Sequence, residues 1–233
     1  MTRGLAALAA VAAVAVVVVL VLLGVRAIPG ADHPETAVLP VPTAPAVPSA
    51  PPDAPVKGLY VRSEVGADGR VEVETWLRSA TPVTELRLTT GDPELVPGSA
   101  EATDLDVRDL DGRVLAHRDS VGTSPQRIVL LAPATELYLT YTIGGGTDGA
   151  TATVEGRTLA RVLAVELEYA GAAGPVRRVV TAAGTVLNVA CVRPGDERRR
   201  SPRPCGRATD DGGWAVVLRG AHRNDLLLAQ LEA

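Results

Sequence analysis

The chain has few of the residues from which catalytic and metal-binding sites are most often built. It contains no phenylalanine, four tyrosines, two tryptophans, three histidines and two cysteines among 233 residues. The shortage of histidine and the absence of a Gly-x-Ser-x-Gly nucleophile motif argue against a hydrolase. Aspartates 104, 106, 109 and 111 do not have EF-hand spacing. We therefore expect no enzymatic activity, no cofactor and no metal site.

The chain is also short of lysine. Lys57 is the only lysine, so arginine carries nearly all of the positive charge, and the formal net charge is only -4. This balance gives no general reason to bind nucleic acid, and any electrostatic interaction must be local. Hydrophobic residues make up 46% of the chain, which is enough for a buried core of Val, Leu and Ala.

The N-terminal segment, residues 1–27, contains an apolar run from Leu5 to Val25 without a charged residue. As a helix this run would be about 30 Å long, which matches the hydrocarbon thickness of a bilayer. Its length favours a retained transmembrane anchor, whereas a secretory signal cleaved near Ala27 is the alternative. Arg3 before the run favours a cytoplasmic N-terminus and an extracytoplasmic C-terminal domain; cleavage would instead give a secreted protein.

Residues 28–56 form a Pro/Ala-rich linker. Proline lacks the backbone donor that a helix or a sheet needs, so polyproline II or a disordered tether is expected here. The linker would separate the membrane anchor from the domain that follows.

Residues 57–233 are expected to form an extracytoplasmic domain of the all-β class. Period-two alternation is clear in RVEVETWLR and ELYLTYTI, and shorter strand-like segments follow at intervals of about ten residues. This spacing predicts a β-sandwich, immunoglobulin-like or related, as one domain or as two subdomains at 57–143 and 150–233. The segment TLARVLAVELEYA is ambiguous between a strand and a helix, and we predict a strand because Val and Tyr recur in it.

Cys191 and Cys205 are predicted to form a disulfide, because an exported domain meets an environment that permits one. Between them lies an arginine-rich loop. Five arginines less two acidic residues leave a net charge of +3 on this loop. Guanidinium groups suit phosphate and carboxylate, so the loop is a candidate anion-binding site; a merely solvated loop is the alternative. The arginines are Arg193, Arg198, Arg199, Arg200 and Arg203.

Trp76 and Tyr138 are out of phase with the apolar faces of their predicted strands. They are candidates for exposed aromatic contacts with a ligand or a partner, unless a neighbouring loop or the linker covers them.

Together these features predict a binding or scaffold protein of the bacterial cell envelope, anchored in the cell membrane through residues 5–25. Its expected partner is an anionic envelope polymer or a neighbouring membrane protein, and not nucleic acid. The alternatives are an accessory subunit of a membrane protein complex and, with less support, an envelope hydrolase.

Overall fold

The computed structural model describes residues 46–91, 100–144, 147–148, 156–171, 174–194 and 201–232. The predicted membrane helix at residues 5–25 lies outside this described part, as does the linker before residue 46. Of the residues described, none belongs to a helix that is long and apolar enough to cross a membrane.

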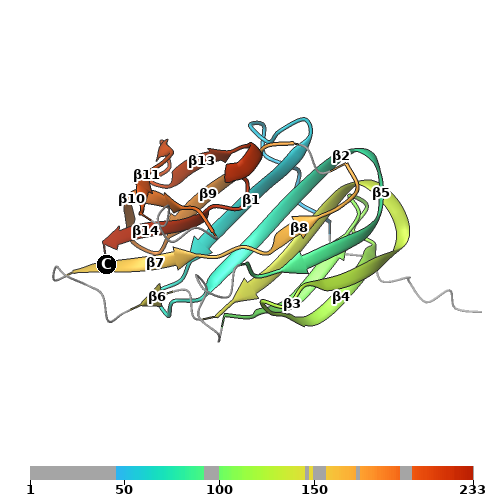
Figure 1. Ribbon diagram of the computed structural model, residues 1–233, viewed down its shortest axis with the longest axis horizontal. Helices are drawn as coiled ribbons and strands as arrows, with labels where there is room; N and C mark the ends of the chain where they lie inside the picture. The colour runs from blue at the N-terminus through green and yellow to red at the C-terminus, as the bar shows by residue number, and fades with distance from the viewer. Residues whose placement is uncertain are drawn as a thin grey trace, which may run out of the picture. The chain divides into compact units, whose positions relative to one another are not determined.

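The described chain folds into two β-sheets, which confirms the predicted β-sandwich (Figure 1). The larger, nine-stranded sheet has eight strands in a row, and the short β8 (Glu166–Glu168) pairs with β2. In spatial order these eight are β12 (Arg207–Ala208), β13 (Trp214–Leu218), β9 (Val176–Ala182), β1 (Gly58–Val65), β2 (Val71–Thr89), β5 (Gln126–Ile143), β3 (Ala102–Arg108) and β4 (Val114–Val121). The five-stranded sheet has the order β11 (Arg203–Pro204), β10 (Thr185–Val192), β14 (Leu226–Glu232), β7 (Arg157–Val162) and β6 (Thr147–Asp148).

The predicted alternation in β2 is confirmed in the buried pattern of the strand. Val71, Val73 and Leu77 point inward and are at most 2% exposed. Successive side chains of a strand point to opposite faces, so a period of two places one apolar row against the second sheet. Inward-facing Val and Leu from both sheets form a single core.

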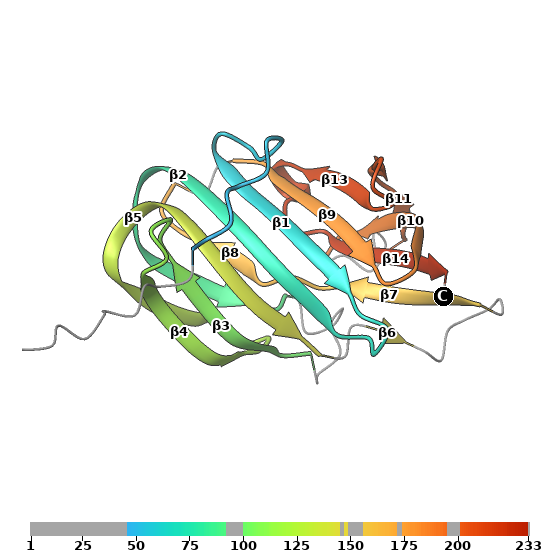
Figure 2. The same ribbon diagram turned by 180° about the vertical axis from the view of Figure 1, so that it is seen from behind.

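Strands from the two halves of the chain share the larger sheet. β1 pairs in parallel with β9, with Leu59 opposite Val176, and antiparallel with β2. The residues from 57 to 143 and those after 150 are therefore joined through a continuous hydrogen-bond ladder and do not form one sheet each. Figure 2 shows β9 beside β1 in this sheet.

The segment predicted as a single strand, TLARVLAVELEYA, forms two. β7 ends at Val162 in the five-stranded sheet, and β8 begins at Glu166 and pairs with β2 in the other sheet. The strand prediction is confirmed against a helix, but its continuity was wrong, because the chain crosses between sheets at residues 163–165. Leu163 and Val165 in this crossing are buried. They continue the period-two pattern of apolar residues, so the change of sheet could not be recognised from the sequence.

Candidate functional site

The predicted disulfide is present and closes the arginine-rich loop at its base. Cys191 lies on β10 and Cys205 directly after β11, and their Cα atoms are 5.8 Å apart. β10 and β11 pair with Cys191 opposite Arg203, and the Cys205 amide donates to the Val189 carbonyl at 3.0 Å. The two ends of the loop are therefore held together by one covalent bond and by backbone hydrogen bonds.

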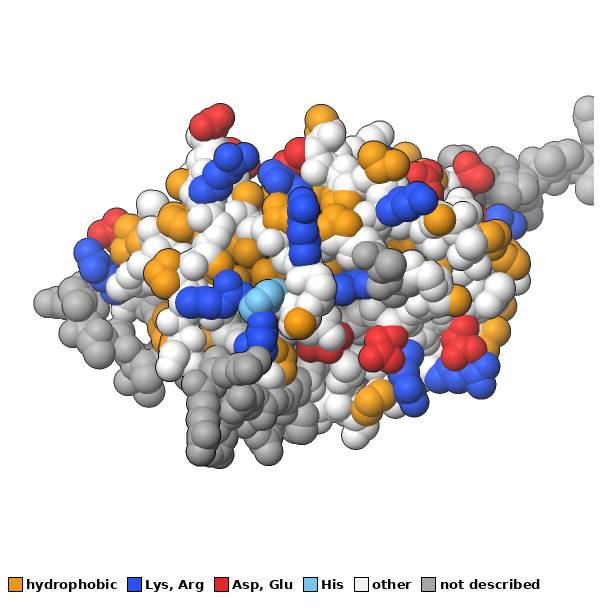
Figure 3. Space-filling model, turned by 45° about the horizontal axis from the view of Figure 1, so that its top comes forward, with side chains coloured by type: hydrophobic (Ala, Val, Ile, Leu, Met, Phe, Trp, Pro, Cys, Tyr) orange, Lys and Arg blue, Asp and Glu red, His pale blue; other side chains and the backbone are white. Residues whose placement is uncertain are grey.

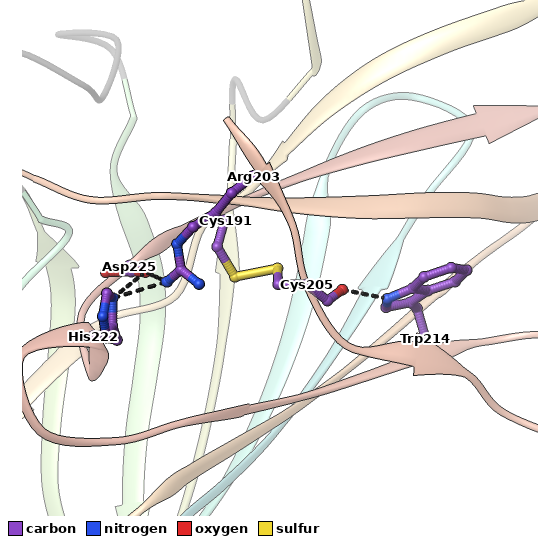
Figure 4. The surroundings of a disulfide bond; sticks show 6 residues. All are labelled: Cys191, Arg203, Cys205, Trp214, His222 and Asp225. Atoms are coloured by element: carbon purple, nitrogen blue, oxygen red, sulfur yellow. Dashed lines mark hydrogen bonds and ion pairs between the residues drawn. A yellow bond between two sulfur atoms is a disulfide. The ribbon is translucent and has the colours of Figure 1, made fainter. Parts of the chain in front are cut away.

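The structure brings two of the five predicted loop arginines, Arg193 and Arg203, together around His222. Figure 4 shows Arg203 beside His222 and Asp225. Nη2 of Arg193 lies 2.9 Å from Nδ1 of His222, and Nη2 of Arg203 lies 2.8 Å from the same nitrogen. Arg198, Arg199 and Arg200 lie outside the described residues. Figure 3 shows several basic side chains around a histidine on one face of the molecule.

Asp225 contacts both Arg203 and His222. Its side chain is fully buried, and its Oδ2 atom pairs with the guanidinium of Arg203 and lies 3.0 Å from His222 Nδ1. The tautomer of His222 decides which of these contacts are hydrogen bonds. A protonated Nδ1 donates to Asp225 and leaves Nε2 to accept from Arg193, whereas an unprotonated Nδ1 accepts from an arginine. His222 is the last residue of the 3-10 turn η3 (Gly220–His222). Its backbone carbonyl accepts a hydrogen bond from the backbone amide of Asp225 at 3.1 Å.

A cavity of about 50 Å³ lies next to this group and opens to solvent. We call it the Arg178 cavity, after the buried arginine of β9 that lines it. Its walls come from β1, β9, the crossing between β7 and β8, and the start of β14. Its lining residues include Leu59, Val61, Leu163, Arg178, Arg223 and Asp225.

Sequence reasoning missed both Asp225 and Arg178. The signal for Arg178 was present, because Val176 and Val180 flank it at a period of two and predict an inward side chain. Asp225 directly precedes β14, and nothing in its local sequence distinguishes it from a turn aspartate.

Trp76 and Tyr138 are not exposed, so of the two alternatives given by the sequence the structure has the covered one. They are 4% and 7% exposed, and they pack with Tyr60 on the outer face of the larger sheet. The ring centroid of Trp76 is 5.6 Å from that of Tyr60 and 5.2 Å from that of Tyr138. The end of the Pro-rich linker covers these rings, so they do not form an open surface.

We call residues 46–56, which lie over these aromatic rings, the linker strap. The indole Nε1 of Trp76 donates to the Pro48 carbonyl at 3.0 Å, and Val47, Ala50 and Ala54 pack against the rings. Asp53 of the linker strap forms an ion pair with Arg177 of β9. Figure 2 shows the linker strap, in blue, crossing the outer face of the sheet. The part of the linker from residue 46 onward thus belongs to the folded domain.

A second histidine lies on the edge strand β4. Nδ1 of His117 is 2.8 Å from Oδ1 of Asp106, and its Nε2 is 3.1 Å from Asp119. The hydrogen bond to Asp106, followed by that to Asp119, raises the pKa of His117. The imidazole is exposed, which fits a surface ion pair better than a general base in an enclosed site.

Comparisons with known proteins give no family for the chain. No family model matches it, and no curated protein matches it. Among solved structures it is similar to an aminopeptidase N family protein from Idiomarina loihiensis, with 12% identity and a TM-score of 0.36. The similarity covers 73% of this chain and 29% of that chain. No function is carried over from a likeness of this degree.

Proposed function

We propose that the protein is a binding module of the cell envelope, anchored in the membrane by residues 5–25, whose arginine-rich loop binds an anionic envelope polymer. The observation that carries the proposal is the convergence of Arg193 and Arg203 at the disulfide-closed base of the loop. The disulfide also supports a location outside the cytoplasm, because reducing conditions inside cells disfavour such bonds.

The base of the loop is preorganised for an anion. Arg203 is anchored by the buried carboxylate of Asp225, and its side chain is still 48% exposed. Arg193 is held beside it through His222. Restricting arginine side chains before binding lowers the entropic cost of binding, and their planar donors match phosphate and carboxylate oxygens.

Exposed charges act weakly one at a time and are screened by salt. Several arginines on one short loop therefore suit a partner with repeated negative charges better than a single small anion. An anionic polymer of the envelope supplies such repeats.

The test is binding of the full-length protein to soluble poly-glycerophosphate, measured at 50 and 300 mM NaCl. The variant Arg198→Ser/Arg199→Ser/Arg200→Ser should bind about tenfold more weakly at the lower salt, since three arginine contacts with the polymer would contribute about 1.4 kcal/mol together. Both proteins should bind weakly at the higher salt.

The matched control removes three exposed arginines far from the loop in sequence: Arg87, Arg118 and Arg157. It has the same net charge as the loop variant and should bind like the wild type. Equal weakening by both triple variants, or no binding of the wild type, would contradict the proposal. Stable co-purification with one membrane protein, without polymer binding, would favour the accessory subunit instead.

A further inference from the structure

Arg178 is a cation inside the sandwich. It lies on β9 between Val61 of β1 and Val216 of β13, and its side chain points toward the second sheet. The residue is 6% exposed. Both of its direct neighbours in the sheet are therefore valines.

The hydrogen bonds of this guanidinium are incomplete. Nη2 donates to the Val162 carbonyl at 2.6 Å, whereas the buried Nε has no partner. Glu166 acts on it only through longer-range electrostatics, and none of the described carboxylates forms an ion pair with it. Burial lowers the pKa of Arg178 to about 10, so it is still protonated at neutral pH. A buried charge without a counterion is strongly unfavourable, so an anionic ligand beside Arg178 would stabilise the folded protein.

The other charged groups that line the Arg178 cavity each have a partner within the protein, although Asp225 Oδ1 and Arg223 Nη2 make no hydrogen bond. Asp225 is paired with Arg203 from the side of the disulfide. Glu166 accepts a hydrogen bond from the Asn224 amide at 2.9 Å. The guanidinium of Arg223 lies 5.8 Å from the centroid of the Tyr169 ring. Arg178 is thus a buried lining charge to which none of the described carboxylates is paired.

The dimensions of the Arg178 cavity restrict what that counterion can be. Its volume of about 50 Å³ holds roughly three to five water-sized positions. A carboxylate group and the carbon that carries it need about as many positions. The walls include Leu59, Val61 and Leu163, which suit a carbon chain leaving the carboxylate toward solvent.

We propose that the Arg178 cavity binds the carboxylate end of an organic acid, with the carboxylate oxygens facing the Arg178 guanidinium. A planar carboxylate matches the planar fork of arginine donors, whereas a tetrahedral phosphate needs more space and more donors. The site lies beside the base of the arginine-rich loop, and its ligand goes beyond the polymer binding proposed above. Apolar walls around one buried cation favour an acid with a short apolar stem.

The test measures the thermal unfolding midpoint of the full-length protein with increasing sodium acetate, at constant pH and at ionic strength held constant with sodium chloride. Binding to the folded state should raise the midpoint by about 3 to 6 °C at ten times the dissociation constant. Sodium phosphate at the same ionic strength should give no comparable shift.

Two neighbouring arginines provide the variant and its control. Arg178→Met keeps much of the side-chain length without the charge and should lose the acetate-dependent shift. Arg177→Met removes the next residue, which points to the opposite face toward Asp53, and should keep the shift. Substituting a buried charge with an apolar residue is often neutral or stabilising, so Arg178→Met is expected to fold.

A second measurement does not depend on either variant. Acetate titrated into the isotopically labelled wild type should move the backbone NMR signals of Val162 and Arg178 but not those of the β3–β4 hairpin. Failure of acetate to act beyond chloride would mean that water alone fills the cavity and would overturn the proposal. An equal acetate shift in Arg178→Met, or a larger effect of phosphate, would also overturn it. Polymer binding by the arginine-rich loop is unaffected by any of these outcomes.

Discussion

Replacement of Trp76 by phenylalanine should release the linker strap without unfolding the domain. The substitution removes the indole donor that binds the Pro48 carbonyl at 3.0 Å, and it keeps an aromatic ring between Tyr60 and Tyr138. A hydrogen bond of this kind contributes about 1 kcal/mol, and the smaller ring loses some packing. The docking of the linker strap should therefore weaken by about 1 to 2 kcal/mol, which raises the released fraction about 5- to 30-fold.

The amide of Ala54 reports on this release. It donates to the Pro51 carbonyl at 2.9 Å, within a turn of the linker strap that packs against the aromatic rings. Native-state hydrogen exchange at this amide should accelerate in Trp76→Phe by the same factor, because exchange there occurs through local opening. Amides in the centre of β2 should exchange as slowly as they do in the wild type, apart from the change in global stability.

Trp214→Phe is the matched control for this experiment. The indole of Trp214 also donates to a backbone carbonyl, that of Cys205, at 2.8 Å, but it does not contact the linker strap. Its loss should leave exchange at Ala54 unchanged. Equal acceleration of Ala54 by both substitutions, or by neither, would refute the idea that Trp76 holds the linker strap in place.

Three further predictions concern stability and titration. The double substitution Cys191→Ala/Cys205→Ala should lower the free energy of unfolding by about 3 kcal/mol in a denaturant titration, and an unchanged value would show that the disulfide adds no stability. Gly58→Ala should cost at least about 2 kcal/mol, because Gly58 has φ +122° and an added Cβ would lie 2.1 Å from the Pro175 carbonyl oxygen, whereas Gly122→Ala, with nothing within 4 Å, should have little effect. Hydrogen bonds to two aspartates raise the pKa of His117 above 6.5, so its stabilising contribution is complete below that pH and is lost as the pH rises through the folded-state pKa; an NMR titration midpoint at or below 6.5 would contradict this.

Local patterning was enough to predict most strands of the fold. Alternation depends on which face of a strand is buried, and it identified the inward row of β2 from Val71 to Leu77 directly. The disulfide could also be predicted, because the chain has only two cysteines and both lie next to strand-like segments.

Long-range pairing could not be predicted in the same way. Nothing in the local sequence of β1 shows that its neighbour is β9, more than a hundred residues later, because backbone ladders carry little sequence information. The packing of the linker strap on the sheet could not be predicted from local sequence either. Its prolines exclude regular structure, but they do not exclude packing of an extended segment on an aromatic face.

The candidate site was only half visible in the sequence. The loop arginines could be identified because five of them lie close together. The groups that contact Arg203, namely His222 and Asp225, come from η3 and from the residue before β14, later in the chain. Arg178 was overlooked because a charged residue in a strand is ordinarily assigned to the solvent face, although its neighbours at a period of two are valines that are buried.

We propose that the folded domain lies on the extracytoplasmic side of the membrane and the N-terminus in the cytoplasm, and the proposed function depends on this topology. Lys57 is the only lysine and its side chain is exposed, so a membrane-impermeant amine reagent applied to intact cells has a single side-chain target. Mass spectrometry of the recovered protein should find Lys57 labelled and the N-terminal amine of Met1 unlabelled. Labelling of Lys57 only after the cells are lysed would contradict the claim.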